Sequence, residues 1–346
     1  GESFSLDYDL PGDTAYAETC ASIGLIFFAR RMLEIEPIGE YADVLERALY
    51  NTVVSGMSRD GKKFFYVNPL EVRPEACGKN RIYDHVKPER QGWFGCACCP
   101  PNIARLLASL GEYIYTVRDR TVYAHLYIGG QAKLELNGQT VSLEQQSAYA
   151  WDGMTRMTVK TDEPTRFALA LRMPSWAGGQ ATLLLNGQPY AFDHADLEAG
   201  YFKIDRVWSN EDAVDVVFDM RVRRMKGHPN VRYTFGKVAL QRGPFVYCME
   251  EADNGRNLHQ IHLPRESPFS VRFIPDLLGG VNVIETTVHR AASDDWQDHL
   301  YLEDSRAVLK TESFIGRFIP YFAWANRNVG EMAVWIRECE SESIPV

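Results

Sequence analysis

The sequence predicts a mixed fold in which a mainly helical segment, residues 1–117, is followed by antiparallel β-sandwich domains. Three observations support this. Apolar residues recur with the 3.6-residue period of helices before Thr116 and with the two-residue period of strands after it. The pairs Asn137-Gly138 and Asn186-Gly187 are typical of tight hairpins, because both turn positions need a positive φ. Short strands at this spacing are typical of sandwiches.

Three helices are expected in the first 117 residues. The first covers about Thr19–Leu33, and the second covers Glu40–Met57. The third begins at the proline pair 100–101, where proline is tolerated because the first amides of a helix lack intrahelical partners. A strand-like run, Lys63–Leu70, precedes the third helix. Three helices are few for an independent domain beside so much sheet, so we expect them to be the last part of a larger helical domain.

Strands are expected wherever apolar and polar residues alternate after Thr116. Between residues 121 and 218 they are Thr121–Ile128, Ala132–Leu136, Thr140–Leu143, Met154–Lys160, Phe167–Met173, Ala181–Leu185 and Ala213–Phe218. The basic stretch Arg221–Asn230, which contains Pro and Gly, is a plausible domain boundary. A closing strand is expected at Met332–Ile336.

Composition excludes several classes of function. The chain has 346 residues, enough for two to three domains, and 45% of them are hydrophobic. Lys and Arg total 37 against 46 Asp and Glu, a net charge of −9, which argues against a nucleic-acid partner or an anionic membrane surface. The apolar run Ile23–Ala29 is far shorter than the roughly 20 residues of a membrane helix.

The number and spacing of the cysteines indicate the kind of site that this chain carries. There are seven, and three of them, Cys96, Cys98 and Cys99, fall within four positions. An odd number with such a cluster fits a metal site or a reactive thiol better than a disulfide framework. Reduced cysteines favour a cytoplasmic location.

The segment Trp93–Asn102, with the sequence WFGCACCPPN, carries the strongest chemical signal. Cys98 and Cys99 stand directly before a helix that starts with proline. The partial positive charge and free amides of a helix start favour the thiolate and should lower the thiol pKa. A thiolate there suits a nucleophile, a ligand for a soft metal, or both. The alternative is three small buried cysteines under an aromatic lid.

Glu18 and Cys20 form a second candidate pair. A carboxylate and a thiolate could complete a four-ligand zinc site with two thiolates from elsewhere. Residues two apart on a regular helix do not face each other, so the pair can share a metal only if the helix begins near Thr19 or Cys20 and leaves Glu18 extended. The alternative is a solvated Glu beside a core Cys. Glu2 by itself is indistinguishable from a solvated charge near a terminus.

Five segments of the chain resemble the sequences of glycoside hydrolase family 127, which contains bacterial β-L-arabinofuranosidases. They are GESFSLDYDLPGDTAYAETCASIGLIFFARRML, YADVLERALYN, FFYVNPLEV, HVKPERQGWFGCACCPPNIARLLASLGEYIYT and PYFAWANRNVGEMAVWI. The resemblance runs essentially the whole length of the chain, and its CACCPPN and ETCAS blocks are highly specific.

The resemblance implies a barrel of paired helices, an α/α barrel, followed by β-sandwich domains, one inserted in another. Residues 1–117 would be the last part of the catalytic barrel, residues 118–218 with 320–346 one sandwich, and residues 219–319 the inserted sandwich. The chain would then correspond to the C-terminal half of the family's usual chain. A further chain or segment would supply the missing barrel helices, and this chain alone would have little glycosidase activity.

The resemblance also implies a site. Cys98 would be the nucleophile of a retaining hydrolase and Glu2 the general acid/base, releasing β-L-arabinofuranose from oligosaccharides or glycoconjugates. Glu46 and Tyr66 would contact the sugar. Zinc would be held by Glu18, Cys20, Cys98 and Cys99.

Two other readings stay open. In a non-catalytic carbohydrate-binding or interaction protein, the same zinc would be a structural ion. A thiol redox protein is disfavoured, because Cys96–Cys99 has the spacing CxCC and not the CxxC of thioredoxin-like units. Metal binding by the eight scattered histidines is disfavoured by their spacing, although His85 could face a sugar pocket.

Overall fold

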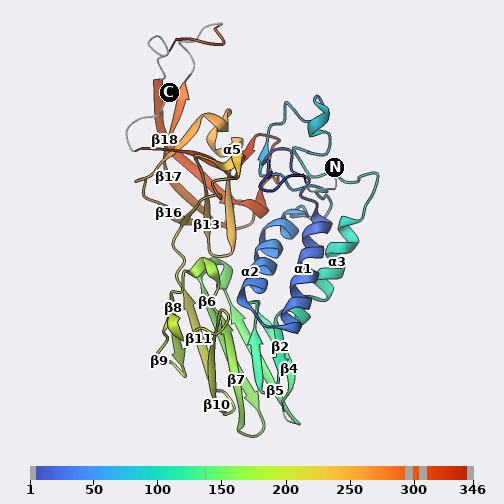
Figure 1. Cartoon of the computed structure of the whole chain (residues 1–346), viewed down its shortest axis with the longest axis vertical. Coiled ribbons are helices and arrows are strands. Elements are labelled where there is room, and N and C mark those ends of the chain that lie inside the picture. Colours follow the sequence, from blue (N-terminus) through green and yellow to red (C-terminus); the bar gives the residue numbers. More distant parts are fainter. Residues whose placement is uncertain (1–4, 137, 293–298, 304–309, 341–346) are drawn as a thin grey trace.

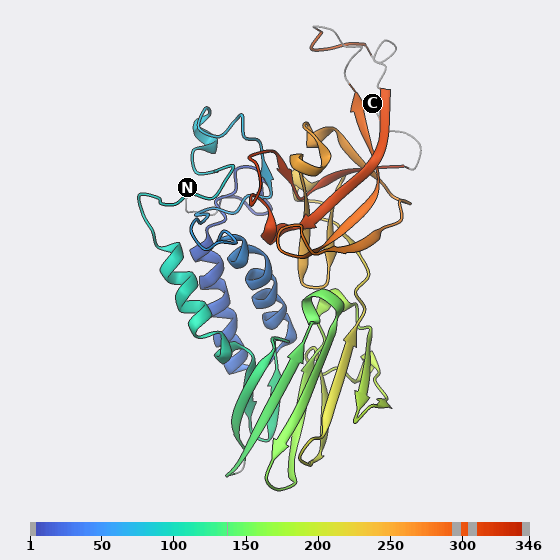
Figure 2. The same ribbon diagram turned by 180° about the vertical axis from the view of Figure 1, so that it is seen from behind.

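The computed structural model describes residues 5–136, 138–292, 299–303 and 310–340. They form a layer of helices, a two-sheet sandwich and a larger C-terminal sheet (Figure 1). Seen from both sides, the helical layer adjoins one end of the sandwich and flanks the C-terminal sheet (Figure 2). The expected mixture of helices and sheets is therefore confirmed. That the helices belong to a larger barrel stays a prediction.

The helical layer consists of three main helices. α1 (Thr19–Ile35) lies between α2 (Gly39–Arg47) and α3 (Cys99–Ala108) (Figure 1). α1 buries Ile23, Ile26 and Leu33 at helical spacing, which is why this segment is helical and why that face packs inward. It ends at Glu36, whose backbone is extended, as expected for a residue before proline. No described helix is both long and apolar enough to cross a membrane.

The second helix differs from its predicted form. After Arg47 it continues as a π-helical turn, Ala48–Val53. The chain then passes so close to α1 that a Cβ on Gly56 would lie 2.9 Å from Cγ2 of Thr19. A side chain would not fit there, so glycine is required where this helix ends against the start of α1. Two further short helices are α4 (Tyr149–Asp152) and α5 (Glu251–Asn254).

The run Lys63–Leu70 does not form the predicted strand. Phe64 makes isolated bridges with Met57 and Gln91, and Val67 makes one with Glu18. Regular pairing begins only at β1 (Glu71–Val72). The run is largely buried and bonds to several different neighbours in turn, so no single partner strand pairs with it along its length.

The middle part is a sandwich of two sheets. The four-stranded sheet has the order β10-β7-β3-β2, with β10 (Tyr201–Trp208), β7 (Thr165–Arg172), β3 (Thr121–Ala124) and β2 (Tyr115–Arg118). The six-stranded sheet has the order β4-β5-β6-β11-β8-β9, with β4 (Gly130–Leu136), β5 (Gln139–Ser147), β6 (Met154–Thr161), β11 (Ala213–Phe218), β8 (Ala181–Leu185) and β9 (Gln188–Tyr190). All pairs are antiparallel except β3–β7. At the β8–β9 turn, Asn186 and Gly187 both have positive φ, as predicted. β10 was not predicted.

The last part is a ten-stranded sheet of order β1-β19-β14-β18-β17-β15-β20-β13-β12, with β16 paired to β17. Its strands beyond β1 are β12 (Arg223–Met225), β13 (Lys237–Arg242), β14 (Phe245–Glu250), β15 (Ile261–Pro264), β16 (Ser270–Ile274), β17 (Val281–Ala292), β18 (Lys310–Pro320), β19 (Met332–Ala333) and β20 (Ile336–Cys339).

The predicted association of residues 320–346 with the first sandwich is wrong. The described strands of that stretch, β19 and β20, pair with β14, β13 and β15 of the ten-stranded sheet. Met332 and Ile336 are buried there. Residues 219–319 are therefore not an insertion in the first sandwich, whose two sheets are formed by residues 115–218.

Buried polar side chains fasten the helical layer to both β parts. Arg172 of β7 is fully buried and pairs with Asp43 and Glu46 of α2. On the other side, the buried Arg90 donates to the backbone oxygens of Ser55 and Trp324, at 2.9 and 2.7 Å. Removing one partner of such a buried pair is costly, because the other charge stays buried without compensation.

We expect Arg172→Met to lower the free energy of unfolding by about 3–5 kcal/mol, because Asp43 and Glu46 would lose their counter-charge. The matched control is Arg166→Met on the same strand, whose ion pair with Asp205 is more than half exposed and whose loss should cost less than about 1 kcal/mol. Urea unfolding followed by tryptophan fluorescence measures both. Equal losses would contradict this account of the interface.

Candidate metal and active centre

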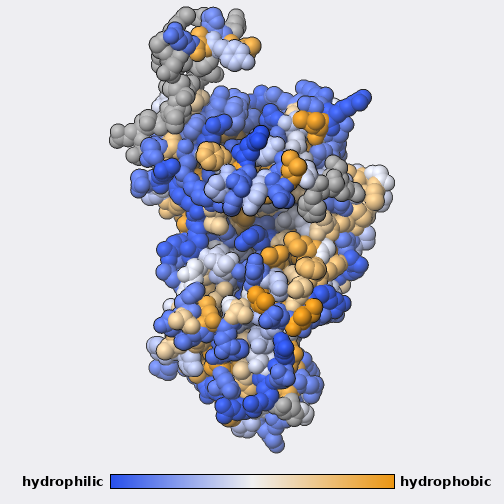
Figure 3. Space-filling model, viewed as in Figure 1, coloured by the Kyte–Doolittle hydropathy of each residue, from blue (hydrophilic) through white to orange (hydrophobic). Residues whose placement is uncertain are grey.

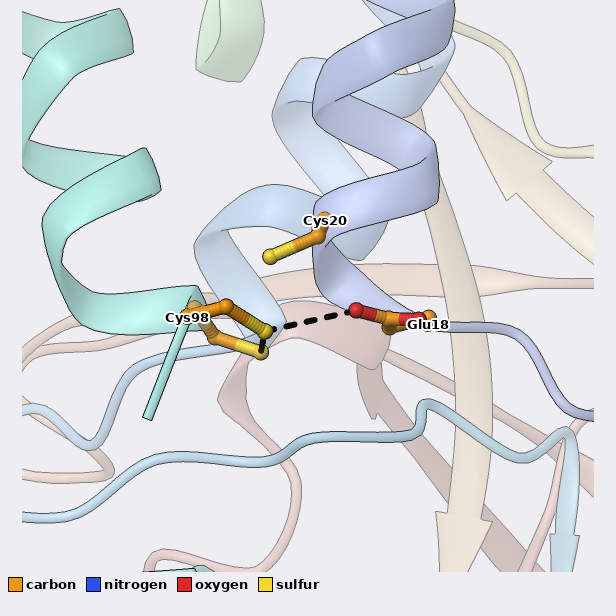
Figure 4. Close-up of side chains that lie close together, drawn as sticks. Glu18, Cys20 and Cys98 are labelled. Carbon is orange, nitrogen blue, oxygen red and sulfur yellow. Dashed lines mark hydrogen bonds between the residues drawn. The ribbon is translucent and has the colours of Figure 1, made fainter. Parts of the chain in front are cut away.

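Two helix starts meet at one end of the helical layer. Glu18 precedes α1 with an extended backbone (φ −67°, ψ 139°), and Cys20 lies in the first turn of that helix. Cys98 precedes α3, Cys99 is its first residue, and the proline pair follows. In Figure 4 the side chains of Glu18, Cys20 and Cys98 converge between these two starts. The late helix start that Glu18 and Cys20 need in order to face each other is therefore present.

The start of α1 is held in place by the segment that failed to form a strand. The backbone N–H of Thr19 donates to the carbonyl of Tyr66 at 2.9 Å, and its hydroxyl donates to the carbonyl of Phe65 at 2.9 Å. The Asn68 amide donates to the same hydroxyl at 2.9 Å. These buried bonds fix Glu18 on its extended backbone and bring the Tyr66 side chain to the same place.

The four predicted ligands form one group. Their donor atoms, from Glu18, Cys20, Cys98 and Cys99, all lie within 4.8 Å of one another. Sγ of Cys98 lies 3.5 Å from Oε1 of Glu18 and 3.9 Å from Sγ of Cys99 (Figure 4). One carboxylate and three thiols at this spacing could hold a metal ion. All seven cysteines are free thiols, so none of the three is engaged in a disulfide.

The thiols of Cys98 and Cys99 are not acidic without a cation. Burial raises the pKa of Cys98 above its ordinary value. Burial, and then the neighbouring Cys20, raise the pKa of Cys99 well above its ordinary value. The helix start, which was expected to lower these pKa values, is outweighed by desolvation and by the crowding of groups that become negative together. The arrangement favours the thiolates only when a positive charge is shared among them.

Tyr66 lies at the cluster, and its predicted contact with the sugar stays a prediction. Its hydroxyl is 3.5 Å from Sγ of Cys98, and this hydrogen bond is the main reason that the pKa of Tyr66 is raised. The ring stands edge-on to Tyr16, with centroids 6.2 Å apart, and tilted against Phe94 at 5.7 Å. His85 packs against Tyr16 at 5.4 Å, so it belongs to this aromatic surround.

The other predicted site residues fare differently. Glu46 is 2% exposed, and Arg172, Tyr149 and Trp176 donate to its two oxygens. The structure contradicts a sugar contact for Glu46, because both oxygens are already engaged at the interface with the sandwich. Glu2 lies outside the described residues. Cys96 is exposed and is not a member of the four-ligand group.

Sequence reasoning missed Tyr16 and Phe94 as neighbours of the cluster. Each stands within four residues of a predicted ligand, which was the available signal. Proximity along the chain does not say which way a ring points, so only the ring contacts with Tyr66 identify them.

Comparison with known proteins supports these observations. Residues 1–112 match the family model described as β-L-arabinofuranosidase, GH127 catalytic domain. Residues 121–220 match the GH127 middle domain, and residues 222–337 match the glycoside hydrolase family 127 C-terminal domain. The chain therefore carries all three domain types of the family. The middle-domain and C-terminal-domain models meet near residue 221.

Individual relatives match over nearly the whole chain. A non-reducing end β-L-arabinofuranosidase of Bifidobacterium longum subsp. longum is 43% identical over 97% of this chain and 51% of its own length. The crystal structure of Ara127N-Se, a GH127 β-L-arabinofuranosidase from Geobacillus stearothermophilus T6, is 51% identical with a TM-score of 0.93, covering 98% of this chain and 52% of that one.

A GH127 β-arabinofuranosidase structure is 36% identical with a TM-score of 0.86, again covering 98% of this chain and 52% of the other. This chain thus spans about half the length of the relatives it matches. With its residues matched in order by the three domain models, the chain belongs to glycoside hydrolase family 127.

Proposed function

We propose that this protein is a retaining glycoside hydrolase that releases β-L-arabinofuranose from oligosaccharides or glycoconjugates. The observation that carries the proposal is the meeting of Glu18, Cys20, Cys98 and Cys99 between two helix starts. Family membership and relatives with β-L-arabinofuranosidase activity support the sugar specificity. The seven free thiols support a reducing compartment such as the cytoplasm.

We propose that the metal is zinc. In a tetrahedral site with Zn–S of about 2.3 Å and Zn–O of about 2.1 Å, neighbouring ligands lie about 3.8 Å apart for two sulfurs and about 3.6 Å for sulfur and oxygen. The corresponding distances here are 3.9 and 3.5 Å. These two distances match a tetrahedral zinc site. Bound zinc would hold the thiols as thiolates, and at Cys98 and Cys99 it would act against the burial that raises their pKa.

The chain's own residues then have distinct tasks. The Cys98 thiolate attacks the anomeric carbon as the bond to the leaving oxygen breaks, and the carboxylic acid of Glu2 gives that oxygen its proton. Water next gives a proton to the Glu2 carboxylate and attacks the same carbon, so that the carbon–sulfur bond breaks and the thiolate returns. Two displacements at one carbon give net retention. The Tyr66 hydroxyl, 3.5 Å from the sulfur, positions Cys98.

We further propose that additional helices of a longer protein cover the open side of the helical layer. Leu25, Phe28 and Ile35 of α1 and Leu107 of α3 are 44–69% exposed. Hydrophobic residues gather over this layer on the face seen in Figure 3. Relatives have about as much chain again beyond the matched half, which is enough for the missing part of a helical barrel. We therefore expect this chain alone to turn over substrate slowly.

Covalent labelling tests the function. A mechanism-based electrophilic β-L-arabinofuranoside should add one sugar to Cys98, because that sulfur is the proposed nucleophile. Peptide mass spectrometry locates the adduct. Cys98→Ser should abolish the adduct, and in the longer protein it should lower the rate of hydrolysis of an aryl β-L-arabinofuranoside at least about a thousandfold. Cys96→Ser, two residues away and outside the ligand group, is the control and should keep both. A non-catalytic binding protein would show no adduct on Cys98.

Metal analysis tests the site. We expect one zinc per chain after dialysis, and Cys20→Ser or Cys99→Ser should weaken its retention by more than about a hundredfold, because a hydroxyl replaces a thiolate ligand. Cys96→Ser should retain the full amount. Elemental analysis and competition with a chelating dye measure this. Full zinc retention in Cys20→Ser would contradict the assignment of the four ligands.

A further inference from the structure

A small cavity lies where the segment before α1 meets the C-terminal sheet. Its volume is about 130 Å³. Six polar or aromatic residues contribute to its lining: Asp13, Glu71, Tyr233, Thr234, Lys237 and Trp335. Glu46, the one sugar-contact candidate that the structure excludes, lies elsewhere, in the interface with the sandwich. Nothing in the proposed reaction uses this cavity.

The walls of the cavity are fastened to one another by backbone hydrogen bonds. The carbonyl of Gly12 accepts from the N–H groups of Leu70 and Glu71, at 2.8 and 3.1 Å. The carbonyl of Leu70 accepts from the N–H of Val334 at 2.9 Å, and Glu71 pairs with Ala333 in the sheet. Three segments far apart in sequence are thus held together, so the cavity is formed before any ligand arrives.

The charges around the cavity are balanced. Glu71 pairs with Lys237 at 3.8 Å. Asp13 accepts from Tyr83 at 2.9 Å and pairs with Arg73 at 3.3 Å. Two carboxylates facing two cations leave no net charge to attract an anion or a cation. A neutral ligand is favoured.

The remaining chemistry suits a polyhydroxylated ring. Tyr233 and Trp335 offer aromatic surface, and Tyr233 is 43% exposed. Among the described residues, none hydrogen-bonds to the Tyr233 hydroxyl or the Trp335 indole N–H, so both are available to a ligand. Apolar lining with a few placed polar groups is typical of small-molecule sites. The volume is well below the roughly 300 Å³ at which pockets for drug-sized ligands begin, so the cavity suits one small unit.

Two short segments join the cavity to the thiol cluster. Asp13 precedes Glu18 by five residues, and a five-residue segment spans at most about 18 Å. Glu71 follows Tyr66, which touches Cys98, by the same number of residues. A short oligosaccharide whose terminal unit lies at Cys98 could therefore place another unit in this cavity.

We propose that this cavity is a second sugar subsite, which holds a neutral unit of the substrate away from the bond that is cleaved. The identity of the sugar rests on the proposed function. The subsite adds affinity for longer substrates and takes no part in bond breaking. It is built jointly by the segment before α1 and by the C-terminal sheet.

Binding measurements test the subsite. In a Cys98→Ser background, which prevents turnover, a β-linked L-arabinofuranose trisaccharide is titrated by calorimetry. We expect Tyr233→Ala to raise the Kd at least fivefold, and Gly12→Leu, which adds a side chain at the cavity wall, to do the same. Gly12 does not have a positive φ, and a Cβ added there would lie 3.8 Å from Cβ of Glu71. The backbone at this position therefore accepts a side chain without a clash at Cβ. Tyr190→Ala, an aromatic residue of similar exposure on β9, is the control and should leave the Kd within twofold.

Labelling separates this proposal from the proposed function. In proteins that keep Cys98, the single-sugar electrophile occupies only the cluster. The Tyr233→Ala variant should therefore be labelled to the same extent as the protein without substitutions. If the protein without substitutions is not labelled at Cys98, the proposed hydrolase function is wrong. If Tyr233→Ala and Gly12→Leu both leave the Kd for the trisaccharide unchanged, the proposed subsite is wrong. An unchanged thermal midpoint in both variants verifies that they are folded.

Discussion

The structure depends on α1 and α3 beginning side by side at the same end of one layer. Each start contributes two of the four side chains that could hold a metal, so the group forms only where the two starts meet. Glu18 takes part only because its backbone is still extended while Cys20 is already helical. The bonds from Thr19 to the buried 65–68 segment hold that backbone, so the geometry of the centre rests on a segment with no regular secondary structure.

The helical layer is positioned from both sides by buried charge. Arg172 fastens it to the sandwich, and Arg90 fastens it to the C-terminal sheet. Buried ion pairs contribute little net stability compared with apolar packing, but they tolerate only one arrangement of partners. These contacts tie the helical layer to the β parts on both of its sides.

The segment before α1 joins the small cavity to the thiol cluster. Asp13 lines the cavity, and five residues later Glu18 belongs to the group that could hold a metal. His85 bonds to the carbonyl of Thr14 at 2.9 Å and packs against Tyr16, so the loop around residues 73–86 supports this segment along its length. A displacement of that loop would therefore reach both the cavity and the cluster.

The sequence by itself determined the local features: the three helices, most strands of the sandwich and the Asn186-Gly187 turn, and it pointed to the CACC and ETC blocks as candidate ligands. These follow from period, proline position and φ preference, which act over a few residues. The resemblance to family 127 supplied the proposals of zinc and of the reaction.

Only the tertiary structure decided the rest. It placed β19 and β20 in the ten-stranded sheet, assigned Glu46 to an ion pair with Arg172, and raised the thiol pKa values by burial. The physical reason is the same in each case: strand partners, salt-bridge partners and desolvation are set by groups far away in the sequence, and a local pattern does not encode which of them will arrive.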